Sequence, residues 1–597
     1  MPHEPTARDN NSVNLSNNLK RLEELTNRLV AAVAGKEPQK AELQGPDTAL
    51  YSKAASAWMS EAMRDPSKLI EQQVGYWGET LKYWSEAQNA LLAGEAKPPV
   101  ENEEKPQDRR FKNPLWDSHP YFRQAKQQYL LNVEMMEKSI HGLDGLSDKE
   151  QRQVDFFSRQ ILDLYSPANF LATNPDALEK AVETEGQSLI DGLENLVRDL
   201  EANQGELAVT LADPDAFEVG VNIATTPGSV VFQNRLFQLI QYKPTTEKVQ
   251  AIPLIIFPPW INKFYILDLK EKNSLIKYAV DQGFTVFIVS WVNPDESFRD
   301  VGFDTYVKDG LFKAVEVVKE ITNEKQVNVI GYCIAGTLLT IGLAHMAKKG
   351  DDSIRCATYF TAMTDFEDSG DLGVFIDDGF LAGIEREVEE KGYLSHFFMS
   401  RTFSYLRAND LVYGPAIRSY MMGEAPPAFD LLYWNSDSTN LPAQMAREYL
   451  SGLYRDNKLS SGEFEILGER LDMAAIKTPL CVIATKSDHI APWKSSFKGL
   501  NKTRGQKKFI LAQSGHIAGI VNPASGGKYG HWTNKASVND LDKWFKDAEF
   551  HEQSWWDDWA LWLRRRSGKK ILPREPGSNN FPVLEAAPGS YVKVKAK

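Results

Sequence analysis

Three residues of this chain have side chains that could together perform nucleophilic chemistry: Cys333, Asp488 and His516. Cys333 lies in VNVIGYCIAGTLL (327–339), where an apolar strand pattern ends at Tyr332 and a helical pattern begins directly after the cysteine. This is the layout of a nucleophile elbow, a sharp strand-to-helix turn that projects its central side chain into a site. A thiolate at a helix N-terminus is stabilised by the helix dipole. Taken alone, the short pattern leaves open that Cys333 is a buried structural cysteine.

The acid and the base each follow a predicted strand. Asp488 comes after PLCVIAT (479–485), and His516 comes after KKFILA (507–512). Nucleophile, acid and histidine in this order, each beyond the carboxyl end of a strand, are typical of α/β-hydrolases. We therefore predict that Cys333, Asp488 and His516 form a catalytic triad. His489 is the competing base, but adjacent residues usually point in different directions, so we assign it either a structural role or a role in supporting the site residues.

Two backbone N–H groups are predicted to stabilise an oxyanion. The first belongs to Ile334, which directly follows Cys333 at the start of the predicted helix. The second is expected in the turn after an early strand, IPLIIF (252–257). Two prolines follow that strand and have no N–H to donate. The second donor is therefore assigned to Trp260 or Ile261.

The elements around these residues predict an α/β fold. From about residue 214 onward, short apolar runs alternate with helical patterns, as expected for a mostly parallel sheet whose strands are covered on both faces. The first two runs are expected to form an antiparallel hairpin at the sheet edge. The predicted strands are 229–233, 236–242, 252–257, 284–290, 327–332, 356–361, 479–485 and 507–512.

The 597 residues are too many for one compact core, so we expect two folded regions. Residues 1–12 are predicted to be a disordered tail, and 13–213 a helical N-terminal domain with a Pro- and Glu-rich linker near 94–107. Residues 214–597 are predicted to form the α/β-hydrolase domain. Within it, 364–475 interrupts the strand-helix alternation and would stand over the carboxyl ends of the strands, so we interpret it as a lid.

One stripe in the helical region has two interpretations. Apolar residues recur there at spacings of three and four, which places them on one face of a helix. This face either packs inside the helical domain or offers a surface to a partner helix or a lipid-like granule. The stripe consists of Ile70, Val74, Trp77, Leu81 and Trp84.

Composition excludes several classes of function. A net charge of -13 argues against nucleic acid as a partner. No apolar run reaches the roughly 18–20 residues of a transmembrane helix, and the N-terminus has no secretory signal pattern. Three cysteines provide no disulfide framework, which favours the cytoplasm, and Cys356 and Cys481 are expected in the core. The histidines and cysteines show no metal-site spacing, so no metal is expected, and His531 is interpreted as a packing or hydrogen-bonding residue and not a ligand.

Long segments of the chain resemble the class I polyhydroxyalkanoate synthases, which work without a second type of subunit. The resemblance covers the whole hydrolase half and extends into the helical half, and segments of this length are highly specific. The similar segments are 108–116, 217–242, 258–269, 289–295, 331–336, 431–442, 487–493, 514–523, 528–534, 554–563 and 587–592.

This resemblance implies an acyltransferase with Cys333 as nucleophile, Asp488 as acid and His516 as base. The implied substrates are (R)-3-hydroxyacyl-CoA, with short acyl chains such as 3-hydroxybutyryl favoured, and the growing polyester chain; no cofactor is implied. The family further implies a homodimer at the surface of cytoplasmic polyester granules, with granule-associated proteins as partners of the N-terminal domain. Two positions depart from the family pattern: Ala335 replaces a usual glycine, and 409–415 lacks the usual aromatic pattern.

Two other functions remain open at this point. An esterase, thioesterase or polymer depolymerase would use the same fold and the same three residues. A granule-binding scaffold protein would use the apolar stripe but leave the triad idle.

Overall fold

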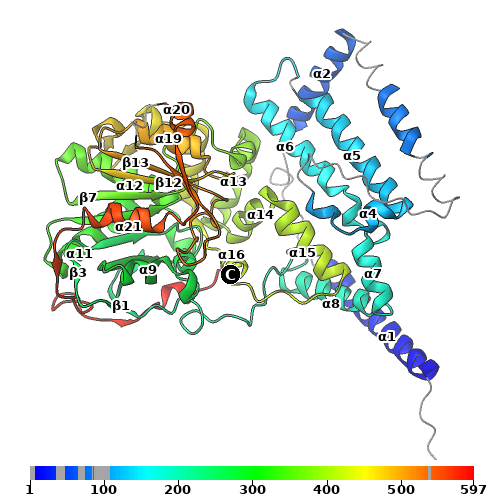
Figure 1. Cartoon of the computed structure of the whole chain (residues 1–597), viewed down its shortest axis with the longest axis horizontal. Helices are drawn as coiled ribbons and strands as arrows, with labels where there is room; N and C mark the ends of the chain where they lie inside the picture. The colour runs from blue at the N-terminus through cyan, green and yellow to red at the C-terminus, as the bar shows by residue number, and fades with distance from the viewer. Residues whose placement is uncertain are drawn as a thin grey trace, which may run out of the picture. The chain divides into compact units, whose positions relative to one another are not determined.

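The computed structural model describes residues 7–34, 48–64, 74–83, 85, 108–141, 143–535 and 540–596 (Figure 1). The chain divides into two compact units. The helical unit comprises Met1–Leu211 with Ser404–Pro427, and the catalytic unit comprises Ala212–Phe403 with Ala428–Lys597. The first boundary lies close to the predicted start of the α/β domain at residue 214.

The catalytic unit is built on an eleven-stranded sheet with the strand order β15-β14-β13-β12-β7-β6-β4-β5-β2-β1-β17. The six strands from β13 to β5 are parallel, and the strands outside them pair antiparallel. The strands are β1 (Gly228–Gln233), β2 (Phe237–Tyr242), β4 (Leu254–Phe257), β5 (Val286–Trp291), β6 (Val327–Tyr332), β7 (Ile354–Phe360), β12 (Leu480–Thr485), β13 (Lys507–Ala512), β14 (His531–Thr533), β15 (Glu549–His551) and β17 (Glu585–Ala586).

All eight predicted strands are present, and β1 and β2 form the predicted antiparallel pair. The pair is not the edge of the sheet, however, because the two-residue strand β17 pairs with the outer side of β1. A strand this short carries no periodic pattern, so its pairing depends on tertiary contacts that a local sequence pattern does not reveal.

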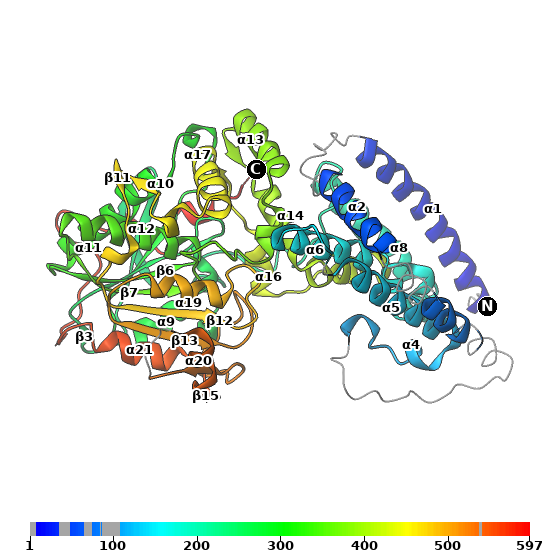
Figure 2. The same cartoon turned by 90° about the horizontal axis from the view of Figure 1, so that it is seen from above.

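Helices cover both faces of the sheet, as the apolar strands predicted. Residues of β4, β5 and β6 pack on one face against α9 (Leu275–Asp281) and α21 (Trp556–Arg564). The indole rings of α21 fill much of this core. Figure 2 shows α11 (Lys313–Thr322) and α12 (Ile334–Lys349) on the opposite side. Strands β4, β5 and β6 are buried along their whole length.

The helical unit has its own small core. Aromatic and aliphatic side chains of its central helices form it: Phe111, Trp116, Phe122, Tyr129 and Val133. No helix among the described residues is long and apolar enough to cross a membrane. The longer helices are α1 (Ala7–Ala34), α2 (Thr48–Arg64), α5 (Pro120–Ile140), α6 (Asp148–Leu164), α7 (Pro175–Glu183) and α8 (Gln187–Ala202).

Two expectations for the N-terminal region need correction. Helix α1 begins at Ala7, so the predicted disordered tail is wrong for residues 7–12; the polar, Asn-rich sequence there hides the helix. In the helix at 74–83, the side chains of Val74, Trp77 and Leu81 are 60–66% exposed, which contradicts packing of the stripe inside the domain. The other two stripe residues and the predicted linker lie outside the described residues.

The predicted lid, 364–475, does not belong to one unit but is divided between the two units. Helix α14 (His396–Leu406) crosses the boundary between the units, and the segment 404–427 belongs to the helical unit. There Asn409 Nδ2 donates to Asp163 Oδ2 at 2.9 Å, and the Tyr420 hydroxyl donates to Asp199 Oδ2 at 2.8 Å. These partners are more than 200 positions away in the sequence, so composition alone could not separate this segment from the rest of the lid.

Candidate active site

Cys333 lies in the turn between β6 and α12, with φ 55° and ψ −124°. This conformation is costly for a non-glycine residue and occurs mostly where function requires it. Hydrogen bonds on both sides hold the turn: the Cys333 N–H donates to the Phe360 carbonyl at 2.9 Å, and the Gly336 N–H donates to the Cys333 carbonyl at 2.8 Å. The structure therefore has the predicted elbow geometry at Cys333.

Two glycines allow strand and helix to approach closely at the elbow. A Cβ on Gly331 would lie 2.6 Å from the Ala335 carbonyl oxygen, and one on Gly336 would lie 2.3 Å from the Cβ of Ala362. Both distances are far below van der Waals contact. Ala335, the departure from the family pattern, is fully buried in the first turn of α12.

Asp488 and His516 form a direct pair at the ends of the adjacent parallel strands β12 and β13. His516 Nδ1 lies 2.8 Å from Asp488 Oδ2, and both side chains are buried. The other carboxylate oxygen of Asp488 accepts the backbone N–H groups of Ile490 at 2.9 Å and Ala491 at 2.8 Å. These donors fix the carboxylate, which in turn orients the imidazole.

The charges around His516 keep its imidazole protonated. Burial by itself lowers the pKa of His516, but the negative charges of Asp488 and Cys333 and the hydrogen bonds to both outweigh it, and raise that pKa to about 10. The imidazole therefore holds its proton at neutral pH. A protonated imidazole beside a cysteine favours the thiolate, which is the form in which cysteine acts as a nucleophile.

Buried aromatic residues hold the loop that carries His516. The Tyr332 hydroxyl donates to the His516 carbonyl at 3.2 Å. The indole N–H of Trp555 donates to the Gly519 carbonyl at 2.8 Å, and that of Trp556 to the Ile520 carbonyl at 3.0 Å. Sequence reasoning assigned no role to these three residues, although two of them lie in the similar segment 554–563.

Beside Cys333 is a narrow cavity of about 10 Å³, the space of roughly one water molecule. Phe366, Tyr449 and Tyr454 contribute to its wall, and all three come from the predicted lid region. Sequence reasoning had named none of them. In this conformation the cavity is too small for a thioester substrate, so the wall must move for an acyl group to enter.

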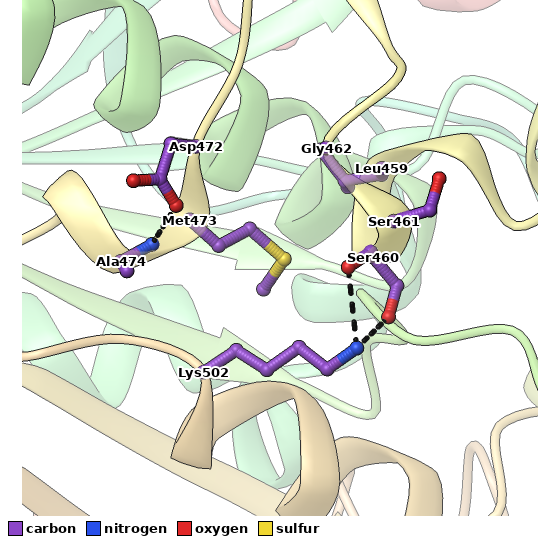
Figure 3. A pocket seen from close by; sticks show the side chains of 8 residues that line it. All are labelled: Leu459, Ser460, Ser461, Gly462, Asp472, Met473, Ala474 and Lys502. Carbon is purple, nitrogen blue, oxygen red and sulfur yellow. Dashed lines mark hydrogen bonds between the residues drawn. The ribbon is translucent and has the colours of Figure 1, made fainter.

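A larger pocket, of about 270 Å³, lies elsewhere in the catalytic unit (Figure 3). Lys502 lies at one side of it and donates a 3.2 Å hydrogen bond to the Ser460 carbonyl. Across the pocket, Asp472 accepts the N–H of Ala474. None of the predicted catalytic or oxyanion residues lines this pocket. Its polar side chains already have hydrogen-bond or ion-pair partners, among them Asp365 for Lys502, so we assign the chemistry to the smaller cavity at Cys333.

The predicted oxyanion residues occupy defined positions. Ile334 is the first residue of α12, and a first-turn N–H has no acceptor within its own helix. Trp260 and Ile261 lie in the loop after β4, and their carbonyl oxygens accept hydrogen bonds from Thr439. The Thr439 hydroxyl donates to Trp260 at 2.6 Å, and its backbone N–H donates to Ile261 at 3.1 Å. The Trp260 ring packs 4.4 Å from the ring of Tyr306. The loop is thus held firmly, and the donor roles stay predictions.

The other candidate residues lie apart from this pair. The carboxylate of Asp488 binds the imidazole of His516, and the backbone carbonyl of His489 accepts the N–H of Asp371. Cys356 and Cys481 are fully buried in β7 and β12, and burial raises the pKa of both thiols. They are core residues, as predicted.

Comparison with known proteins identifies the family to which this chain belongs. Residues 107–279 match the model described as the N-terminus of poly-beta-hydroxybutyrate polymerase (PhaC), and 253–523 match the alpha/beta hydrolase fold. A poly(3-hydroxyalkanoate) polymerase from Methylorubrum extorquens is 40% identical over 92% of this chain and 90% of its own length. The chain belongs to the poly(3-hydroxyalkanoate) polymerase family.

Two further polymerases of the family show the same level of similarity. The polymerase subunit PhaC of Rhizobium meliloti (strain 1021) is 40% identical over 91% of this chain and 88% of its own length. That of Cupriavidus necator is 40% identical over 82% of this chain and 83% of its own. Membership of the polymerase family confirms the resemblance, the α/β-hydrolase fold and the acyltransferase class predicted from the sequence.

Proposed function

We propose that this chain polymerises (R)-3-hydroxyacyl groups from their coenzyme A thioesters, with Cys333 as nucleophile, Asp488 as acid and His516 as base. The observation that carries the proposal is the 2.8 Å Asp488–His516 pair in the same catalytic unit as a cysteine held in an elbow conformation. The relatives named above are poly(3-hydroxyalkanoate) polymerases, which supports this reaction and this class of substrate.

In the first half-reaction, the Cys333 thiolate attacks the thioester carbonyl of the substrate. The Ile334 N–H, together with that of Trp260 or Ile261, stabilises the negative charge that develops on the carbonyl oxygen. When the carbon–sulfur bond to coenzyme A breaks, the His516 imidazolium gives its proton to the departing thiolate. Free coenzyme A and an acyl thioester on Cys333 remain.

In the second half-reaction, the now neutral His516 accepts the proton of a 3-hydroxyl group from another acyl unit. The resulting alkoxide attacks the acyl carbon on Cys333, an ester forms, and the cysteine leaves as a thiolate. The thiolate-imidazolium pair is thereby restored. Asp488 keeps the imidazole oriented and stabilises its charge throughout.

A hydroxyl group must outcompete water for the acyl thioester. The apolar part of the cavity wall at Cys333 supports this preference, because Ile334, Met363, Phe366 and Ala491 limit the access of bulk water. A cysteine is also suited to the task, since the enzyme thioester keeps the reactivity of the incoming one. A hydrolase would instead need an open path for water.

The proposal extends to where the protein works. Its product is an insoluble polyester, so the enzyme would act at the surface of granules in the cytoplasm. The family resemblance further implies a homodimer whose helical unit meets granule-associated proteins. The exposed side chains of Val74, Trp77 and Leu81 support an apolar contact of this kind.

The test measures coenzyme A release and polymer formation from (R)-3-hydroxybutyryl-CoA, with wild type and Cys333→Ala compared. We expect wild type to release coenzyme A and form polyester, and Cys333→Ala to do neither while keeping its circular dichroism spectrum. A Cys356→Ala variant is the matched control, since it removes a buried thiol outside the site and should keep the activity.

Three results would contradict the proposal. Release of coenzyme A with free 3-hydroxybutyrate as the product would make the chain a thioesterase. Activity that survives in Cys333→Ala would mean that the nucleophile lies elsewhere. Binding to polyester granules without any turnover of the thioester would favour the scaffold function.

A further inference from the structure

A second cluster of chemically capable side chains lies outside the catalytic cavity. His531 of β14 and His551 of β15 are direct partners in the antiparallel register, and their rings stack with centroids 4.9 Å apart. Asp558 approaches them from the first turn of α21. One potential ligand atom from each of the three residues lies within 4.8 Å of the others.

The hydrogen bonding of His531 shows where its proton is. Its Nδ1 lies 2.8 Å from the backbone carbonyl oxygen of Gln553, which can only accept, so Nδ1 carries the hydrogen. In the neutral imidazole, the Nε2 lone pair then faces Asp558 Oδ2 at 3.4 Å. Two electron-pair donors facing each other require a positive charge between or beside them, and a proton on Nε2, the nearby Lys508 ammonium or a metal ion can each supply it.

The 3.4 Å separation fits a protonated ion pair and also has room for a metal ion. A charge-assisted N–H···O bond to a carboxylate is typically about 2.7–2.9 Å long. A tetrahedral zinc ion with bonds of about 2.0–2.1 Å places neighbouring ligand atoms roughly 3.3–3.4 Å apart. The distance from His531 Nε2 to Asp558 Oδ2 therefore equals the edge of a zinc tetrahedron, although an ion pair can have the same length.

We propose that His531 Nε2, a ring nitrogen of His551 and the carboxylate of Asp558 bind one Zn²⁺ ion, with water in the fourth position. Nitrogen and carboxylate oxygen are ligands that zinc prefers. Two supporting hydrogen bonds orient the imidazoles, as is usual around zinc: His531 Nδ1 to Gln553, and Thr533 Oγ1 to His551 Nε2 at 2.8 Å. Binding requires the partly exposed His551 ring, which is stacked on the ring of His531, to turn and move closer so that both rings point a nitrogen at the ion.

Such an ion would join two short strands to α21. Gln553, whose carbonyl fixes His531, lies two residues before Trp555, which holds the loop of His516. The site is separate from the catalytic cavity, so we assign the ion a structural role.

Lys508 is the competing cation at this cluster. Its Nζ lies 3.7 Å from Asp558 Oδ2, the same oxygen that faces His531. A lysine there neutralises part of the charge that zinc requires. Replacing it with an uncharged side chain of similar length should therefore strengthen zinc binding, whereas a simple His531–Asp558 ion pair predicts no such gain.

The experiment uses the full chain, dialysed against EDTA and then titrated with zinc chloride in a calorimeter, with bound zinc counted by mass spectrometry and melting followed in parallel. We expect one zinc per chain and a higher melting temperature when zinc is bound. Asp558→Asn and His551→Gln should each weaken binding at least about 10-fold, as loss of a ligand-sphere group does. Lys508→Met should bind zinc more tightly than wild type, and Cys333→Ala should bind it equally well.

Three outcomes would overturn the proposal. Wild type that binds no stoichiometric zinc leaves a proton-bridged ion pair as the explanation of the cluster. Binding that is unchanged in Asp558→Asn places the ion elsewhere, and binding lost in Cys333→Ala places it at the nucleophile. If Asp558→Asn does not fold, Lys508→Met decides the matter: unchanged or weaker zinc binding in this variant counts against the site.

Discussion

The hydroxyl of Tyr332 donates a 3.2 Å hydrogen bond to the backbone carbonyl of His516, so the residue before the proposed nucleophile holds the loop of the proposed base. The two rings lie 5.9 Å apart, and Tyr332 is buried. The elbow and the histidine loop are thereby joined by one side chain in addition to the triad itself.

Removing this hydroxyl should affect catalysis more than binding. In Tyr332→Phe the ring stays and one hydrogen bond is lost, which typically costs about 0.5–1.5 kcal/mol, or roughly 2- to 13-fold in a rate constant. We expect kcat for coenzyme A release to fall by this factor while KM changes little. A proportional rise in KM with unchanged kcat would show that Tyr332 acts on substrate binding instead.

Trp555→Phe tests a second hydrogen bond that holds the loop of His516. It removes the indole N–H that binds the Gly519 carbonyl, and we expect kcat to fall about 5- to 50-fold as His516 loses its fixed position. Trp559→Phe is the matched control, because its indole N–H binds Thr358 in the core and not the loop. Equal losses of activity in both variants would mean that the effect is a general loss of stability.

Asp488→Asn should disable the base while leaving the fold intact. In the comparable serine enzymes, this exchange lowers kcat by about 10⁴, and we expect a loss of roughly 10³- to 10⁴-fold here. Because the Asp488 charge raises the pKa of His516, the alkaline limb of the kcat/KM profile should also move to lower pH. An unchanged alkaline limb in the residual activity would contradict the pairing.

The raised pKa of His516 also predicts a pH-dependent stability. The folded chain keeps a proton up to about pH 10 that the unfolded chain releases near the ordinary value of 6.5. The stabilising contribution is therefore complete below about pH 6.5 and is lost as pH rises through about 10. The melting temperature of wild type relative to His516→Gln, followed from pH 6 to 10.5, should show this decline. A difference that grows with pH would contradict it.

The elbow should tolerate removal of the methyl group at Ala335 but not addition of a methyl group at Gly336. In Gly336→Ala the new Cβ would collide with Ala362, and such overpacking typically costs about 1–3 kcal/mol of unfolding free energy. Ala335→Gly restores the family's usual residue and should cost at most about 1 kcal/mol and keep the activity. Urea unfolding of both variants, with coenzyme A release as the second measurement, tests this contrast.

Several features followed from the sequence because they depend on neighbouring residues. The elbow at Cys333 needs an apolar strand, two glycines and a helix start within ten positions, and all are visible in 327–336. The positions of Asp488 and His516 beyond strand ends follow equally from local apolar runs. Since parallel strands in such a fold end at one edge of the sheet, their order along the chain was enough to predict that these residues meet.

Other features were decided by tertiary structure alone. Segment 404–427 joins the helical unit through Asp163 and Asp199, and the wall of the catalytic cavity brings Phe366 and Tyr454 against Cys333. His531, His551 and Asp558 share no metal-site spacing, and only the pairing of β14 with β15 and the docking of α21 bring them together. Such contacts depend on how distant elements pack, and packing free energy is a property of the whole core, so no local pattern of residues encodes them.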